Sequence, residues 1–205
     1  MKKKYWLIIL IAVLLIGVVL LLYKGMSPKF AREVPEAEKN LRQQVLDAGE
    51  AWLGAKEKDG SHHPIVDIYN SHLPLARGYE VLYTDDWCSV FVSTVAIQAG
   101  LTDYIPTECG CEPQINLFRE LGAWVEADDY VPLPGDYIFY HWDCTEPGDC
   151  VAWSDHVGIV VGTVGPYIKV LEGNCDNRVA YRYVRINGQE IRGFGIPDYA
   201  GAAGI

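Results

Sequence analysis

The segment DDWCSVFVSTVAIQAG, from Asp85 to Gly100, places a cysteine where a helix is expected to begin. An apolar run of helical character follows Cys88, and Gly100 is a typical helix stop. Unpaired backbone N–H groups and the positive end of the helix dipole gather at a helix start, and both favour a thiolate. Cys88 is therefore a candidate nucleophile. A structural cysteine also fits this segment, because free cysteine is among the most buried residue types.

A cysteine nucleophile needs a histidine as its base and a third polar group that orients the imidazole. His156 begins the β-rich run HVGIVVGTV, and the next run ends in EGN, with Glu172 and Asn174 two positions apart on one face. In an antiparallel hairpin that turns near Gly165 and Pro166, His156 becomes a near neighbour of Glu172 and Asn174. The other histidines lie in turn-rich stretches or beside a strand: His62, His63, His72 and His141.

These residues form a candidate triad of Cys88, His156 and either Glu172 or Asn174. His156 would take the thiol proton, and the thiolate would attack an amide carbonyl. The backbone N–H of Cys88 would meet the resulting oxyanion, with Tyr83 as a candidate second donor. The tryptophans that flank these segments could line a substrate groove or could equally pack in the core: Trp87, Trp142 and Trp153.

The hydrophobic periodicity of the elements that must position these groups changes along the chain. Helical spacing covers residues 36 to 53, the run opened by Cys88, and residues 113 to 121, whereas residues 60 to 78 read as irregular and turn-rich. Short β-rich runs follow at 136 to 142, 156 to 164, 167 to 174, 179 to 186 and 191 to 197. Their short connections indicate antiparallel pairing. Helices followed by an antiparallel sheet predict an α+β fold.

With these pieces in order, the chain resembles the CHAP domains (cysteine, histidine-dependent amidohydrolase/peptidase) of the papain-like peptidoglycan hydrolases. The resemblance covers roughly residues 38 to 198 and rests on WCSVFVSTVAIQAG, PGDYIFY, DHVGIVVG and EGN. It implies a helical lobe packed on a curled antiparallel sheet of about six strands. It also implies that Cys88 is the nucleophile, that His156 is the base, and that Glu172 and Asn174 assist.

The resemblance further implies that the substrate is peptidoglycan. The bond would be the N-acetylmuramoyl–L-alanine linkage or a peptide bond of the stem or cross-bridge. Some members of this family carry a calcium loop of closely spaced aspartates before the nucleophile. Asp67, Asp85 and Asp86 do not form such a loop. We therefore expect no required metal and no cofactor.

The N-terminus predicts a membrane anchor. Residues 5 to 23 are uncharged and overwhelmingly apolar, long enough to span a bilayer as one helix. No small-residue cleavage site follows, which argues against a cleaved signal peptide. Lysines before the span place the N-terminus in the cytoplasm. We expect an anchor over 5 to 23, a stalk over 24 to 36 and an extracellular catalytic domain over 37 to 199.

The remaining five cysteines fit an oxidising exterior. Cys144 and Cys150 bracket TEPGD and are the first choice for a disulfide, and a four-thiolate zinc site that adds Cys109 and Cys111 is the alternative.

The net charge of −10 argues against nucleic acid as a partner. The expected partners are peptidoglycan and, through the anchor, the lipid bilayer. Two other functions stay open: a catalytically silent domain that binds peptidoglycan, and a structural accessory of an envelope-spanning secretion or conjugation apparatus that contacts its other proteins.

Overall fold

The computed structural model describes residues 33–127, 129–144 and 150–205. The predicted anchor over residues 5 to 23, and all but the last four residues of the predicted stalk, lie outside these ranges. Within them, no helix has both the length and the apolar character needed to cross a membrane.

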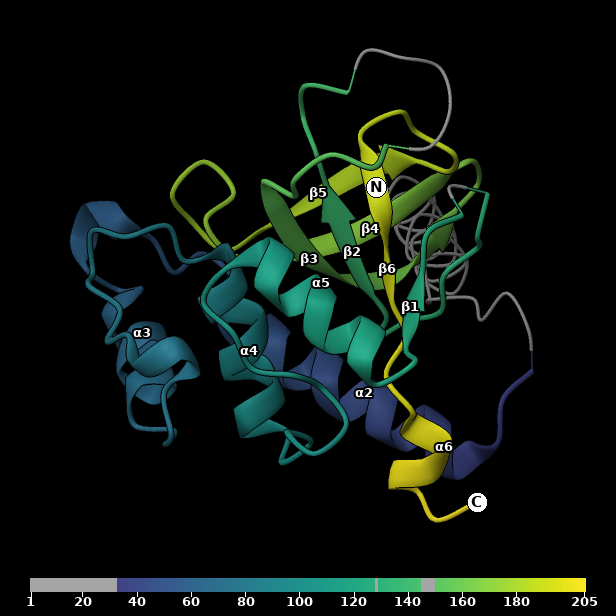
Figure 1. Cartoon of the computed structure of the whole chain (residues 1–205), viewed down its shortest axis with the longest axis horizontal. Coiled ribbons are helices and arrows are strands. Elements are labelled where there is room, and N and C mark those ends of the chain that lie inside the picture. Colours follow the sequence, from purple (N-terminus) through teal and green to yellow (C-terminus); the bar gives the residue numbers. More distant parts are fainter. Residues whose placement is uncertain (1–32, 128, 145–149) are drawn as a thin grey trace, which may run out of the picture.

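The described residues form an α+β fold in which helices gather against one antiparallel sheet (Figure 1). The helices are α2 (Glu36–Glu50), α3 (His63–Asn70), α4 (Cys88–Gln98), α5 (Cys111–Glu120) and α6 (Tyr199–Ala202), with short 3-10 turns at Glu57–Asp59 and Ala76–Gly78. The strands are β1 (Trp124–Val125), β2 (Tyr137–Tyr140), β3 (His156–Val164), β4 (Tyr167–Glu172), β5 (Ala180–Arg185) and β6 (Ile191–Gly195). They pair in the order β1-β6-β2-β3-β4-β5, and every pairing is antiparallel. The α+β class and the antiparallel pairing are as the sequence predicts, and six strands match the number that the resemblance to CHAP domains implies.

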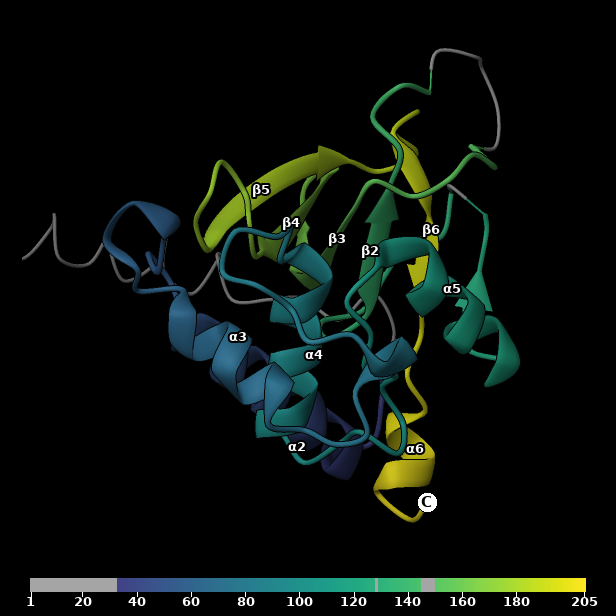
Figure 2. The ribbon, with the colours of Figure 1, turned by 60° about the vertical axis from the view of Figure 1, so that its left-hand side comes forward.

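Helix α4 is the centre of the molecule. Its residues from Cys88 to Ala96 are all buried, so the helix has no solvent-facing side. A helix that is apolar all round must be enclosed by other elements. Helix α4 packs against α2, α3 and β3, and the views of Figures 1 and 2 both place it between the other helices and the sheet. The core therefore holds the start of α4, and with it Cys88, in a fixed place.

The β3–β4 hairpin has a register that changes partway along. Val164 pairs with Tyr167 across the turn, and the register shifts by one residue between Val160 and Gly162. Gly162 has a φ of 153°, and a glycine inside a strand commonly marks such a bulge. Because side chains alternate between the two faces of a strand, a shift of one residue decides which β4 side chains share a face with His156.

A buried ion pair joins the first helix to the sheet. Arg42 of α2 donates hydrogen bonds to the Pro134 carbonyl and to Asp136 Oδ1, both at 2.8 Å. Asp136 also accepts from the Leu133 N–H at 2.8 Å. A buried charge pair needs such additional hydrogen bonds to be tolerated. The PGD segment that precedes β2 is thus fixed to α2.

Four elements differ from the sequence prediction. Helix α3 lies in the stretch expected to be irregular, where Pro64 stands at a helix start, a position that tolerates proline. Helix α5 begins at Cys111, two residues before the predicted start. The two-residue strand β1 and the four-residue helix α6 are too short for a periodic signal.

Candidate active site

Cys88 is the first residue of α4, as the sequence predicts, and it is 6% exposed. The residue before it, Trp87, is fully buried, and its indole N–H donates to Glu57 Oε1 at 2.9 Å. This burial corrects the prediction that Trp87 could line a substrate groove. Trp87 instead packs in the core at the N-terminus of α4 and helps to fix the backbone of Cys88.

His156 and Glu172 come together across the β3–β4 hairpin. His156 Nε2 lies 3.0 Å from Glu172 Oε2, and both side chains are buried. Continuing the register of the hairpin places Gly158, two residues from His156, opposite Glu172. A Cβ atom at Gly158 would lie 2.8 Å from Glu172 Cγ. Because Gly158 has no side chain, that of Glu172 can cross β3 diagonally and reach the imidazole.

The charges of Cys88 and His156 stabilise each other. A hydrogen bond from Cys111 lowers the pKa of Cys88 to about 5, helped by His156 and the Ser89 N–H and opposed by burial. Burial alone would lower the pKa of His156, but Cys88 and Glu172 outweigh it and raise that pKa to about 9. At neutral pH this arrangement holds a thiolate beside an imidazolium, the reactive form of a cysteine nucleophile.

Arg182 of β5 holds Glu172 in its ionised form. Its Nε donates to both carboxylate oxygens, at 3.1 and 2.8 Å. Burial would raise the pKa of Glu172, but the hydrogen bonds and charges of His156 and Arg182 outweigh it and lower that pKa. No motif in the sequence marks Arg182 as a site residue. Its position one strand beyond Glu172, on the same face of an antiparallel pair, is the signal that could have found it.

Asn174 lies near the nucleophile segment rather than at the histidine. It follows the end of β4 with a φ of 54°, and its Nδ2 donates to Asp86 Oδ1 at 3.2 Å. Of the two alternatives for the third member of the triad, only Glu172 therefore contacts His156. Asn174 ties the end of β4 to the loop that precedes Cys88.

Of the other predicted groove residues, the structure places Trp142 beside His156. The two rings lie 5.8 Å apart, Trp142 is 43% exposed, and its ring stacks on Tyr140 at 4.8 Å. Trp153 is also exposed, in the loop that leads into β3. Tyr83 does not fit the predicted oxyanion role, because its hydroxyl donates to Asp67 at 2.6 Å.

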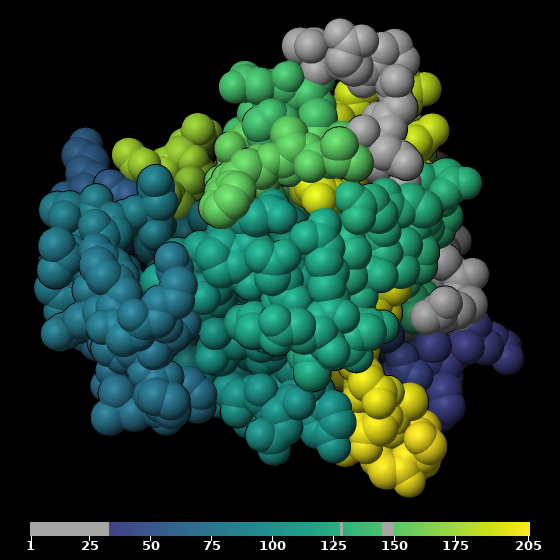
Figure 3. Space-filling model, in the orientation of Figure 1, coloured from purple at the N-terminus to yellow at the C-terminus, as the bar shows by residue number. Residues whose placement is uncertain are grey.

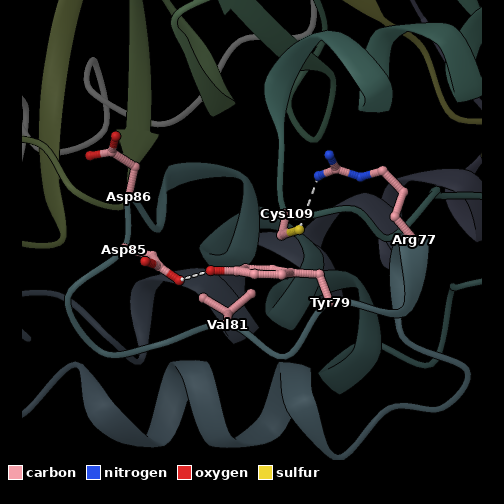
Figure 4. Close-up of a pocket in the computed structure, with 6 residues that line it drawn as sticks. All are labelled: Arg77, Tyr79, Val81, Asp85, Asp86 and Cys109. Carbon is pink, nitrogen blue, oxygen red and sulfur yellow. Dashed lines mark hydrogen bonds between the residues drawn. The ribbon is translucent and has the colours of Figure 1, made fainter.

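A pocket of about 480 Å³ lies beside the loop that precedes Cys88 (Figure 4). The residues that line it combine carboxylates, a guanidinium, a phenol and a thiol: Arg77, Tyr79, Val81, Asp85, Asp86 and Cys109. Tyr79 donates to Asp85 and Arg77 to Cys109, as the dashed lines show. On the face drawn in Figure 3, the blue segment before residue 80 and the teal segment after residue 100 lie side by side.

Among the described residues, the cysteines other than Cys88 divide into one disulfide and three free thiols. Cys144 and Cys150 form the predicted disulfide, with their Cα atoms 6.0 Å apart. This bond excludes the alternative of a four-thiolate zinc site, which needed both as free thiolates. The free thiols are Cys109, Cys111 and Cys175. The sequence pattern suggests only a disulfide or a zinc site for Cys111. In the structure, its Sγ lies 3.6 Å from the Sγ of Cys88.

The sequence matches no protein-family model and no curated protein. The fold is similar to the crystal structure of an NlpC/P60 family protein from Bacillus cereus ATCC 10987, with a TM-score of 0.42 and 17% sequence identity. The similarity covers 80% of this chain and 40% of that one. The chain thus spans less than half the length of this similar protein.

Proposed function

We propose that the chain is a membrane-anchored cysteine amidohydrolase or peptidase that cleaves amide bonds of peptidoglycan. The observation that carries the proposal is the convergence of Cys88, His156 and Glu172, which come from one helix and two strands of the core. A nucleophile, a base within reach and a group that orients the base form the minimal unit of nucleophilic catalysis.

In the proposed reaction, the Cys88 thiolate attacks the amide carbonyl, and the backbone N–H of Cys88 stabilises the oxyanion. The C–N bond breaks as His156 donates its proton to the departing amine. Water, deprotonated by His156, then hydrolyses the thioester, and the thiolate returns. Glu172 keeps the imidazole in place and favours its protonated form throughout the cycle.

Three features support peptidoglycan as the substrate. The segments around Cys88, His156 and Glu172 resemble those of CHAP domains. Trp142 also offers an exposed aromatic face beside His156, suited to packing against a sugar ring or a peptide. The mixed charges of the pocket around Asp86 and Arg77 complement the amines and carboxylates of a short peptide. We assign Trp142, Asp86 and Arg77 to substrate binding.

The proposed location is the outer face of the cell membrane, with the apolar segment of residues 5 to 23 as a single-pass anchor. The Cys144–Cys150 disulfide supports an oxidising compartment, because disulfides persist outside the cytosol. Protease added to intact cells should degrade the domain from residue 33 onward while an N-terminal tag stays protected. Protection of the domain and loss of the tag would reverse the orientation.

The direct test is digestion of purified cell walls with the chain in detergent, followed by mass spectrometry of the released fragments. Cleavage of the N-acetylmuramoyl–L-alanine linkage would release stem peptides with a free alanine amine, whereas an endopeptidase would release shorter pieces. Cys88→Ala serves as the control and should release nothing, because it removes the thiol that forms the thioester in the proposed reaction.

The alternative functions, a silent wall-binding domain or an accessory of an envelope apparatus, predict a different result. A silent domain would sediment with walls without releasing fragments, and Cys88→Ala would behave like the wild type. The proposal fails if wild-type chain and Cys88→Ala leave walls of several chemistries equally intact.

A further inference from the structure

Two thiols meet at the candidate site. Cys88 is the first residue of α4 and Cys111 is the first residue of α5, and their Sγ atoms lie 3.6 Å apart. Both residues are buried, and neither belongs to a disulfide. Because two helix starts face each other here, each sulfur lies near unpaired N–H groups and the positive end of a helix dipole. Only one of the two thiols can readily ionise, because two adjacent buried anions would repel each other.

The surroundings decide which sulfur carries the charge. Cys88 interacts with His156 and with the Ser89 N–H, both of which favour its thiolate. Cys111 faces the Cys88 sulfur and also the negative charge of Asp155; its contact with Cys88, together with burial, raises the pKa of Cys111 well above its ordinary value. Cys111 therefore keeps its proton at neutral pH, where Cys88 is ionised.

We propose that Cys111 is a further catalytic residue, whose S–H donates a hydrogen bond to the Cys88 sulfur and keeps the nucleophile ionised. This proposal rests on the proposed function only in taking Cys88 as the nucleophile. A hydrogen bond to the charged form of a group favours that form, and it is stronger in a buried site than in water. The thiolate then has two donors, the imidazolium of His156 and the thiol of Cys111.

The position of Cys111 does not depend on its own sulfur. Ser89 donates to Gln114 Oε1 at 2.8 Å, which joins α4 to α5. Gln114 Nε2 donates to the Pro106 carbonyl at 2.9 Å, and the Ser154 N–H donates to Glu112 at 3.1 Å. These bonds fix the first turn of α5 to its neighbours. Removing the thiol should therefore remove a donor and leave the backbone in place.

The test is the pH dependence of Cys88 alkylation by iodoacetamide in full-length chain in detergent, followed by mass spectrometry of the peptide that contains Cys88. Cys111→Ala and Cys111→Val both lack a donor, and each should raise the alkylation midpoint by about one pH unit or more. At pH 5, near the wild-type midpoint, a shift of one unit corresponds to a rate about fivefold lower. Cys111→Ser keeps a donor and should stay within about half a unit of the wild type.

Cys109→Ala is the matched control. It removes a free thiol two residues away that accepts a hydrogen bond from Arg77 and does not contact Cys88, and it should leave the midpoint unchanged. Thermal melts show whether each variant is folded, and Cys111→Val gives a second donor-free side chain if Cys111→Ala does not fold. In wall hydrolysis, the acidic limb of the pH profile should move with the alkylation midpoint.

A midpoint that stays within about 0.3 units of the wild type in folded Cys111→Ala or Cys111→Val would overturn the proposal. So would faster alkylation of Cys111 than of Cys88 at pH 6, because Cys111 would then be the anion. Equal shifts in the Ser and Ala variants would mean that the sulfur matters for packing and not for its proton. The alkylation midpoint needs no substrate, so failure of the wild type to digest walls would count against the proposed function alone.

Discussion

At the scale of single residues, Glu172 is the most constrained group of the site. Its carboxylate is fully buried and lies between a cation of β3 and a cation of β5, His156 and Arg182. Arg182 in turn lies over the ring of Trp142, with its guanidinium carbon 5.0 Å from the ring centroid. One charged side chain thus links the orientation of the base to the aromatic face on which a substrate could lie.

The first prediction separates Glu172 from Asn174. Glu172→Gln keeps the shape of the side chain but removes the charge that favours the imidazolium, so kcat/KM should fall by at least about tenfold. Asn174→Gly keeps the left-handed backbone and removes only the contact with Asp86, so its loss should be smaller. Steady-state kinetics of both variants measures the difference. A larger loss in Asn174→Gly would make Asn174 the more important residue.

The second prediction concerns pH. The Cys88 pKa of about 5 and the His156 pKa of about 9 predict that kcat/KM rises with pH as the thiolate forms near 5. It should then fall as the imidazolium, the acid that protonates the leaving amine, loses its proton near 9. The two apparent values belong to the pair rather than to either residue.

Glu172→Gln gives the matched test of this profile. Without the carboxylate, the imidazolium loses part of its stabilisation, so the basic limb should move to lower pH. A basic limb that moves to higher pH in this variant would contradict the assignment of Glu172 as the group that favours the charged base.

At the scale of elements, the bulge in β3 decides the composition of the site. Without the shift between Val160 and Gly162, Glu172 would pair with Ile159 and point to the face opposite His156. With it, Glu172 lies opposite Gly158 and shares the face of the histidine. A single extra residue in one strand therefore converts an ordinary hairpin into one that joins a base and a carboxylate.

The third prediction tests the passage of Glu172 over β3. In Gly158→Ala the new Cβ would clash with Val170 and Glu172, so the carboxylate should lose its contact with His156 and kcat/KM should fall by at least about tenfold. Gly165→Ala, at the turn of the same hairpin, meets no neighbour but has a φ of 58°. It should cost about 1 kcal/mol of stability and leave the activity intact.

Thermal melts and kinetics of these two glycine variants give the comparison. Full activity in folded Gly158→Ala would mean that the carboxylate reaches the imidazole by another route, or is not needed there.

The sequence predicts those parts of the site whose positions follow from local patterns of residues. The apolar run after Cys88 predicted the start of α4, and the alternation and turn around Gly165 predicted the hairpin and the proximity of Glu172 to His156. It did not reveal the bulge, because two glycines in HVGIVVG fit a regular strand as well as a bulged one. Nor did it predict the contact between Cys88 and Cys111, which depends on how two helices pack and has no periodic signal.

The same limit applies to the aromatic residues. Trp87 and Trp142 both flank motif segments in the sequence, yet the first is fully buried and the second is 43% exposed. Their environments depend on tertiary packing around α4 and on the position of the loop after β2. The sequence does not predict helix α3 for a related reason. A proline and adjacent histidines resemble a turn unless the packing partner is known.

At the scale of the whole molecule, the cysteines divide by role. One pair, Cys144 and Cys150, closes the loop between β2 and β3, whereas Cys88 must remain reduced to act as a nucleophile. A low-pKa thiolate is the form most open to oxidation. Under the proposed function and location, the chain would therefore combine a bond that needs oxidising conditions with a group that such conditions inactivate.

The fourth prediction is the thiol count. Protein denatured without reductant should contain four reactive thiols, and reduction should raise the number to six. Strong reductant should also lower the melting temperature, because opening a loop this short removes roughly 2 kcal/mol of stability at most. Mild reductant should raise the activity of aged samples by restoring Cys88. Six thiols before reduction would contradict the disulfide.

The burial of α4 from Cys88 to Ala96 has a consequence for when the protein becomes active. The nucleophile stands at the start of the most enclosed helix, and its partners arrive only when β3 and β4, much later in the sequence, have packed against that helix. Contacts between distant parts of a chain form late in folding, since loop closure must come first. A chain that is still being synthesised or threaded across a membrane therefore carries an ordinary thiol and no catalyst. Under the proposed function and location, the cell that makes the chain would be protected from it until the domain has folded.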